Sequence, residues 1–199
     1  MKQTFTLLLF LIISHYSFSQ VNHEIRWTIG TSEPYIKGSS IMTTSDSHIS
    51  YRMKKVREAS LKYITQVKDH TYLETGITYL QGNVTIDYVS WGEIYKRSSG
   101  TLQLLSIPFF LNRTFGKYFY ISGGPTFDFH LNDEFSKDYS GIGAVLGVGG
   151  MYRIKNLTFY LTPKVGKKAL WRPDINKVER KLTELNIEFG FGYRLPSKQ

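Results

Sequence analysis

The chain has 199 residues, which is enough for one domain with its own core. It contains no cysteine, so disulfide bonds and a lipid anchor on an N-terminal cysteine are excluded. The mean hydropathy is −0.24, which argues against a bundle of membrane-spanning helices. It is compatible with a membrane β-barrel, because half of each barrel strand is polar. The net charge of +9 is compatible with binding to anionic lipid, with binding to nucleic acid, and with lysines that are only solvated at the surface.

The N-terminus has the pattern of an export signal. Lys2 supplies a positive charge, residues 7–13 form a short apolar run, and Ser17-Phe18-Ser19 provides the small residues that a signal peptidase requires. The apolar run is shorter than the roughly 20 residues that a helix needs to span a bilayer. We therefore predict a signal peptide at residues 1–19 and one exported domain at residues 20–199, for which nucleic acid is not an expected partner.

Eight stretches of the exported domain alternate between apolar and polar side chains, which indicates strands with one apolar and one polar face. The alternation is clearest near the C-terminus, where every odd residue from Leu185 to Leu195 is large and apolar. A proline, Pro108, lies inside the fourth stretch, where it argues against a central position. The predicted strands are residues 23–31, 59–67, 72–80, 102–112, 119–131, 141–154, 157–165 and 185–195.

The predicted connections alternate in length. Long polar segments follow the first, third, fifth and seventh strands, and short turns follow the second, fourth and sixth. Outer-membrane barrels have this asymmetry, with short periplasmic turns and longer outer loops. The sequence thus predicts an all-β fold, a single eight-stranded antiparallel up-and-down transmembrane β-barrel in the bacterial outer membrane. The long connections are residues 32–57, 81–100, 132–140 and 166–181, and the short ones are 68–70, 113–117 and 155–156.

The polar faces of these strands carry charges of both signs in about equal number. An eight-stranded lumen is just wide enough for side chains to fill it, and desolvated charges need partners. We therefore predict an internal salt-bridge network and no open pore, with Gly147, Gly149 and Gly150 making room for large neighbours. The predicted members of the network are Glu24, Arg26, Lys62, Glu74, Asp128, Arg153, Lys164, Glu184, Glu188 and Arg194.

Two further sets of residues are expected to meet the membrane. Outward-facing aromatic residues would form belts at its interfaces, as in other membrane proteins. The segment 166–181 is basic, and as an outer loop it would bind lipopolysaccharide phosphates through charge-assisted hydrogen bonds; the alternative is that its charges only keep the loop soluble. The belt residues are Trp27, Tyr63, Tyr79, Tyr152 and Tyr193, and the candidate lipid contacts are Lys167, Lys168, Arg172, Lys177 and Arg180.

Four passages suggest a relationship to known proteins: Tyr72-Leu73-Glu74-Thr75-Gly76-Ile77-Thr78-Tyr79, Leu105-Ser106-Ile107-Pro108-Phe109-Phe110, Tyr120-Ile121-Ser122-Gly123-Gly124-Pro125 and Gly190-Phe191-Gly192-Tyr193-Arg194-Leu195. Through them the exported domain resembles bacterial outer-membrane β-barrel proteins of the group that includes PorT-like proteins. The resemblance implies an eight-stranded barrel, and some members of the group serve protein secretion. One departure is that many such barrels end on an aromatic residue, whereas here Pro-Ser-Lys-Gln follows Leu195.

The remaining candidate chemistry is a hydrolytic site. His130 and Asp128 share one face of the fifth strand, and Ser136 and Ser140 follow in the next loop, so a catalytic triad can be drawn from them. Because geometry and not sequence spacing defines a triad, a polar lumen histidine is the simpler interpretation. No metal-ligand spacing appears among the five histidines and no phosphate-binding motif is present, so no cofactor is predicted.

Three hypotheses follow for the function. The first is a non-enzymatic outer-membrane barrel with a closed lumen and a structural, assembly or secretion-associated role in the envelope. The second is an outer-membrane barrel that hydrolyses lipid or peptide at His130. The third is a soluble exported barrel that binds a small apolar ligand, which would require the apolar side chains to point inward.

Overall fold

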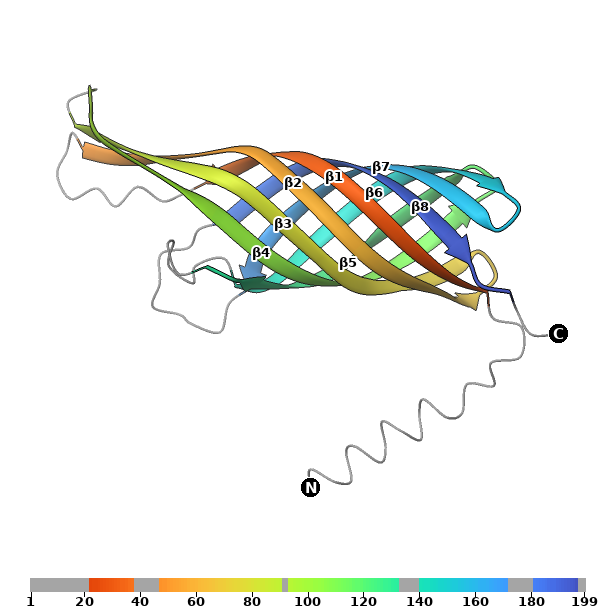
Figure 1. The fold of residues 1–199 in the computed structure, drawn as a ribbon. Coiled ribbons are helices and arrows are strands. Elements are labelled where there is room, and N and C mark those ends of the chain that lie inside the picture. The colour runs from red at the N-terminus through yellow and green to blue at the C-terminus, as the bar shows by residue number, and fades with distance from the viewer. Residues whose placement is uncertain (1–21, 38–46, 91–92, 133–139, 172–180, 197–199) are drawn as a thin grey trace, which may run out of the picture.

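The computed structural model describes residues 22–37, 47–90, 93–132, 140–171 and 181–196 (Figure 1). The predicted signal peptide at residues 1–19 lies outside these ranges. The described residues form eight strands, and they contain no helix long and apolar enough to cross a membrane. The strands are β1 (His23–Lys37), β2 (Ser47–Lys68), β3 (Thr71–Ser90), β4 (Glu93–Phe115), β5 (Phe119–His130), β6 (Gly141–Ile154), β7 (Leu157–Trp171) and β8 (Lys181–Arg194).

The eight strands form a closed antiparallel barrel in which each strand pairs with its neighbours in the chain. Closure comes from β1 and β8, which pair from Glu24 with Arg194 to Lys37 with Lys181. Closure leaves no unpaired strand edge within the barrel wall, as a hydrocarbon environment requires. The predicted fold class, an eight-stranded antiparallel up-and-down barrel, is therefore confirmed.

The apolar faces of the strands point outward. In β8, Leu185 is 62% exposed and Phe189 is 55% exposed, whereas the alternate residues Glu184, Asn186 and Glu188 are buried. The same alternation runs along the half of every other strand that adjoins the short turns. In this part the barrel has a continuous apolar exterior and a polar interior. This orientation excludes a cup lined by apolar side chains, which the soluble ligand-binding hypothesis required.

Three predicted loops are partly wrong, because the strands extend beyond their predicted ends. In the predicted loop 166–181, residues 166–171 continue β7 and Lys181 begins β8. Residues 32–37 continue β1, residues 47–57 belong to β2, and residues 81–90 and 93–100 form a paired extension of β3 and β4. Only residues 91–92 connect β3 to β4. In the extension the pattern changes, because apolar side chains such as Met53 and Val84 are buried on the inward face. The apolar-outward alternation that identified the other strands therefore does not continue there.

The extended ends of β2, β3 and β4 project past the rest of the barrel at one end (Figure 1). At the opposite end lie the start of β1, the end of β8 and the three short turns. His70, Lys155 and Gly116 in these turns have φ values of 60°, 52° and 63°, the left-handed backbone that tight strand connections use. By the rule for outer-membrane barrels, the short turns are periplasmic and the extended end faces outward.

If the outward face meets hydrocarbon, a charge introduced there must destabilise the barrel. Leu161 is 46% exposed near the middle of the apolar band of β7. Leu161→Lys is expected to reduce the free energy of unfolding in lipid vesicles by about 2–4 kcal/mol. Asn156→Lys, in the exposed periplasmic turn, is the matched control and should change it little. Equal effects of the two lysines in urea titrations would contradict the membrane orientation.

Candidate functional site

The centre of the lumen holds six charged side chains in an unbroken chain of ion pairs in which the sign alternates. Arg26 on β1 contacts Glu24 at 3.2 Å and Glu74 of β3 at 3.1 Å. Lys62 on β2 contacts the other oxygen of Glu74 at 3.3 Å and Glu188 of β8 at 2.6 Å. Lys164 on β7 completes the chain by pairing with the second oxygen of Glu188. We call these six residues the central ion chain.

Polar and aromatic side chains of other strands make further contacts with the residues of the central ion chain. The Tyr160 hydroxyl donates to both carboxylate oxygens of Glu24, at 2.7 and 2.8 Å, and the guanidinium carbon of Arg26 lies 3.5 Å from the centre of the Tyr160 ring. Asn112 donates to Glu74 at 2.8 Å. The Tyr120 hydroxyl hydrogen-bonds that of Thr162, and the ring packs edge-on against Tyr160. A cation held against an aromatic face and two carboxylates is strongly fixed in position.

A second charged group lies further toward the extended end. Lys168 of β7 contacts Asp128 at 3.3 Å and Glu184 at 3.6 Å, and it donates to the Ser106 hydroxyl at 3.2 Å. Ser106 in turn donates to Asp128 at 2.6 Å. Lys168, Asp128 and Glu184, called the outer triad below, are all buried.

Toward the extended end, the inward faces of β2, β3 and β4 carry apolar side chains. A buried hydrophobic cluster of β2, β3 and β4 side chains lies here, and we call it the apolar cap. Leu102 and Leu104 have no exposed surface, and Leu80 and Val56 are 1% exposed. The remaining members are Met53 and Val84. The sequence predicted only polar residues on the inward face, so the apolar cap is a feature that it did not reveal.

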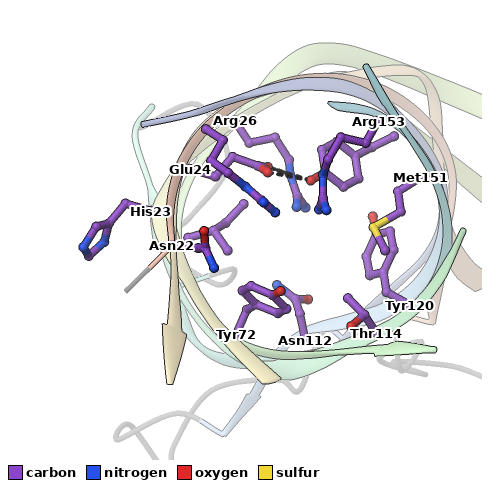
Figure 2. A pocket seen from close by; sticks show the side chains of 13 residues that line it. Asn22, His23, Glu24, Arg26, Tyr72, Asn112, Thr114, Tyr120, Met151 and Arg153 are labelled. Atoms are coloured by element: carbon purple, nitrogen blue, oxygen red, sulfur yellow. Dashed lines mark hydrogen bonds and ion pairs between the residues drawn. The ribbon is translucent and has the colours of Figure 1, made fainter. Parts of the chain in front are cut away.

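Little space is left between these layers. At the short-turn end a pocket of about 30 Å³ opens between Glu24, Arg26, Tyr72, Asn112 and Tyr120 (Figure 2). Figure 2 shows these side chains pointing into the lumen, whereas His23 points away from it. A second pocket of about 20 Å³ lies between the central ion chain and the outer triad. Each has room for about one water molecule.

The structure places the predicted network residues in three situations. Arg26, Lys62, Glu74, Lys164 and Glu188 lie in the central ion chain, with Glu24 at its end, and Asp128 and Glu184 belong to the outer triad. Arg153 and Arg194 line the pocket at the periplasmic mouth, and among the described residues neither makes an ion pair; Arg153 is exposed and contacts the Thr158 hydroxyl at 3.5 Å.

The candidate lipid contacts need a correction. Lys168 was predicted in an outer loop, but β7 continues to Trp171 and the alternation of the strand turns Lys168 inward, where it is 4% exposed. Lys167 points outward and is exposed, whereas Arg172, Lys177 and Arg180 lie outside the described residues. Continuing the even-numbered inward positions Thr162, Lys164 and Gly166 by one step would have found Lys168.

Two of the three predicted spacer glycines do make room for large side chains. A Cβ on Gly149 would lie 2.3 Å from the Tyr120 ring, and one on Gly147 would lie 2.9 Å from the Lys164 side chain. Gly150 differs, because the nearest atom to its Cβ would be the Tyr118 carbonyl oxygen at 3.9 Å.

Two of the proposed triad residues, Asp128 and Ser140, have other contacts in the structure. The Asp128 carboxylate accepts from Ser106 and Thr126 and pairs with Lys168. The Ser140 hydroxyl accepts the backbone N–H of His130 at 3.0 Å. Ser136 lies outside the described residues. The described part of the chain also contains no cluster of acidic and histidine side chains suited to a metal ion.

Two solved structures of outer-membrane proteins are similar to this chain, and the first agrees with its architecture. The outer membrane protein OprG from Pseudomonas aeruginosa superposes with a TM-score of 0.57 at 12% sequence identity, over 89% of this chain and 97% of that chain. Ail, the attachment invasion locus protein of Yersinia pestis, gives a TM-score of 0.48 at 13% identity, over 88% of this chain and 99% of that one. No family model and no curated protein matches the chain.

The fold, the apolar exterior and the charged, filled interior together define the class. The protein is a bacterial outer-membrane β-barrel with eight strands. The similarity to OprG, at this identity, concerns the fold alone.

The central ion chain predicts a specific pattern of stability changes. Glu188→Leu removes the ion-pair partner of Lys164 and leaves Lys62 with Glu74 only. We expect a loss of about 3–5 kcal/mol in the free energy of unfolding, the usual cost of leaving a buried charge without its partner. Urea titration of the barrel in lipid vesicles measures it.

The double variant Glu188→Leu/Lys164→Leu tests the physical reason. It removes one charge of each sign, so the Lys62–Glu74 pair remains and no extra buried charge is left. Most of the lost stability should return, because buried pairs can be replaced by apolar residues at little cost. Equal destabilisation of the single and double variants would show that packing, and not charge pairing, determines the effect of Glu188.

Proposed function

We propose that this protein is a non-enzymatic outer-membrane barrel that acts as a structural, assembly or secretion-associated component of the envelope, and not as a channel. The observation that carries the proposal is the filled lumen. The central ion chain and the outer triad fill successive levels of the lumen, and the apolar cap fills the inward face of β2, β3 and β4. The pocket at the short-turn end has a volume of only about 30 Å³, and the pocket between the two charged groups has about 20 Å³. A solute larger than water has no path through such layers without breaking buried ion pairs.

The extended end supports a role in contacts outside the membrane. β2, β3 and β4 have 22, 20 and 23 residues, about twice the 9–11 that span the apolar layer. Part of this extension is fixed by Arg97, whose Nε lies 2.6 Å from an oxygen of the buried Asp87. This hydrogen bond raises the pKa of the Arg97 guanidinium above its usual range. Ser98 and Ser99, next to Arg97 in β4, are exposed.

The resemblance of four sequence passages to PorT-like barrels points to the same role, since some members of that group serve secretion. The paired extension offers a rigid surface of the kind that a second envelope protein can bind, because its backbone is already ordered and little conformational entropy is lost. No specific observation favours the hydrolytic alternative at His130.

The closed lumen is tested by conductance. Protein reconstituted in a planar lipid bilayer is expected to give no discrete current steps, because ions would have to cross the buried charges and the apolar cap. A sixteen-stranded porin, whose lumen is an aqueous channel, provides the positive control in the same bilayer. Reproducible steps of appreciable size from the folded barrel would contradict a closed lumen.

The interaction role is tested by site-specific crosslinking in whole cells. A photoreactive amino acid at Ser98 should give a protein adduct of defined mass, which mass spectrometry of affinity-purified envelope material identifies. The same group at Phe127, which is exposed in the apolar band, is the control and should give lipid adducts only. Absence of a protein adduct at Ser98 and at Ser99 would contradict an interaction through the extension.

A further inference from the structure

A groove of about 500 Å³ lies on the outward face of the barrel, across β8, β1, β2 and β3. Its lower part follows a row of neighbouring residues. Ile29 pairs with Phe189 on one side and with Ala59 on the other, and Ala59 pairs with Tyr79. Ala59 is the one small side chain in this row, so the wall sinks between Ile29 and Tyr79. The depression therefore results from the sequence of β2 and not from a gap in strand pairing.

The upper part of the same groove is polar. Thr31, Arg57 and Gln81 form the next outward row, in which Arg57 pairs with both of the others. Arg57 is exposed. The side chain of the neighbouring Glu58 points to the other side of the wall, where it accepts a hydrogen bond from Asn186 inside the barrel. The groove thus has an apolar lower part and a cationic upper end.

The height of Arg57 places this polar end at a membrane surface. Arg57 lies eleven residues before Lys68, the last residue of β2 at the periplasmic turn. At about 3.3 Å per residue and a tilt of 35–45°, the separation along the barrel axis is roughly 26–30 Å, close to the ~25 Å height of the apolar band. Arg57 therefore lies at the outer headgroup level, with the apolar part of the groove directly below it in the outer leaflet.

We propose that this groove binds the lipid A part of lipopolysaccharide, the phosphorylated glycolipid of the outer leaflet. One acyl chain lies over Ala59 between Ile29 and Tyr79, and a phosphate group accepts hydrogen bonds from the Arg57 guanidinium, whose planar fork matches phosphate oxygens. Gln81 and Thr31 beside it offer further polar atoms to the sugar. The inference rests on the outer-membrane location and is independent of the proposed envelope role.

The test uses the folded barrel in detergent micelles, titrated with bisphosphorylated lipid A, with bound lipid counted by native mass spectrometry. Arg57→Gln should weaken binding about tenfold, the usual effect of losing one charge-assisted hydrogen-bonded contact. Ala59→Leu fills the groove and should weaken binding several-fold while leaving Arg57 in place. Dephosphorylated lipid A should bind wild type and Arg57→Gln equally, because the contact that distinguishes them is then absent.

Two controls carry comparable changes elsewhere on the outward surface. Arg113→Gln removes an exposed arginine at the periplasmic end of β4, and Val148→Phe adds apolar bulk on β6, four strands away from β2. Both should bind lipid A as wild type does, and heat-dependent migration on gels confirms that all variants are folded. The proposal is overturned if Arg57→Gln and Ala59→Leu bind like wild type, or if the controls weaken binding equally. It is also overturned if phosphatidylglycerol shows the same affinity and the same dependence on both residues.

Discussion

The wall of the barrel is surrounded by hydrocarbon and not by water. Hydrocarbon cannot hydrogen-bond a free backbone group, so each N–H and C=O in the wall must find a partner in a neighbouring strand. The pairing of β1 with β8 meets this requirement, because it closes the sheet and removes both edges. Side-chain orientation follows from closure, since alternate residues must then face either lipid or lumen. The exposed Leu185 and Phe189 and the buried Glu184 and Glu188 are direct consequences.

Closure with eight strands makes the lumen narrow, so the charged side chains inside it are removed from water. Charges taken out of water are costly unless each has partners of opposite sign. The central ion chain does this by alternation: each carboxylate of Glu74 and Glu188 lies between two cations, and Arg26 and Lys62 each lie between two carboxylates. Because the members come from β1, β2, β3, β7 and β8, the chain also crosslinks the wall. The filled lumen and the long outer extension together support a protein that acts by binding at its surface.

The outward surface is not a uniform apolar band, because its shape and its charge vary from strand to strand. The row of Ile29, Ala59 and Tyr79 forms a depression that a row of large side chains would not, and Arg57 marks where the band ends. The same strand, β2, contributes Lys62 to the lumen and Met53 and Val56 to the apolar cap. One strand, β2, thus contributes side chains to the lumen, to the apolar cap and to the lipid-facing groove.

The amino-acid sequence was sufficient to predict the number of strands, their faces and the main lumen charges, because alternation at period two is a local property of each strand. It therefore identified Arg26, Lys62, Glu74 and Glu188 as inward residues without a structure. It did not predict how far β2, β3, β4 and β7 extend, because apolar side chains such as Met53 and Val84 face inward in the extension and the apolar-outward alternation stops there. Lys168, placed in a loop by its basic neighbours, pairs with Asp128 and Glu184 only because β7 continues. Which charge meets which, the apolar cap and the groove at Ala59 depend on the register between strands, and register is a property of the closed barrel and not of any single strand.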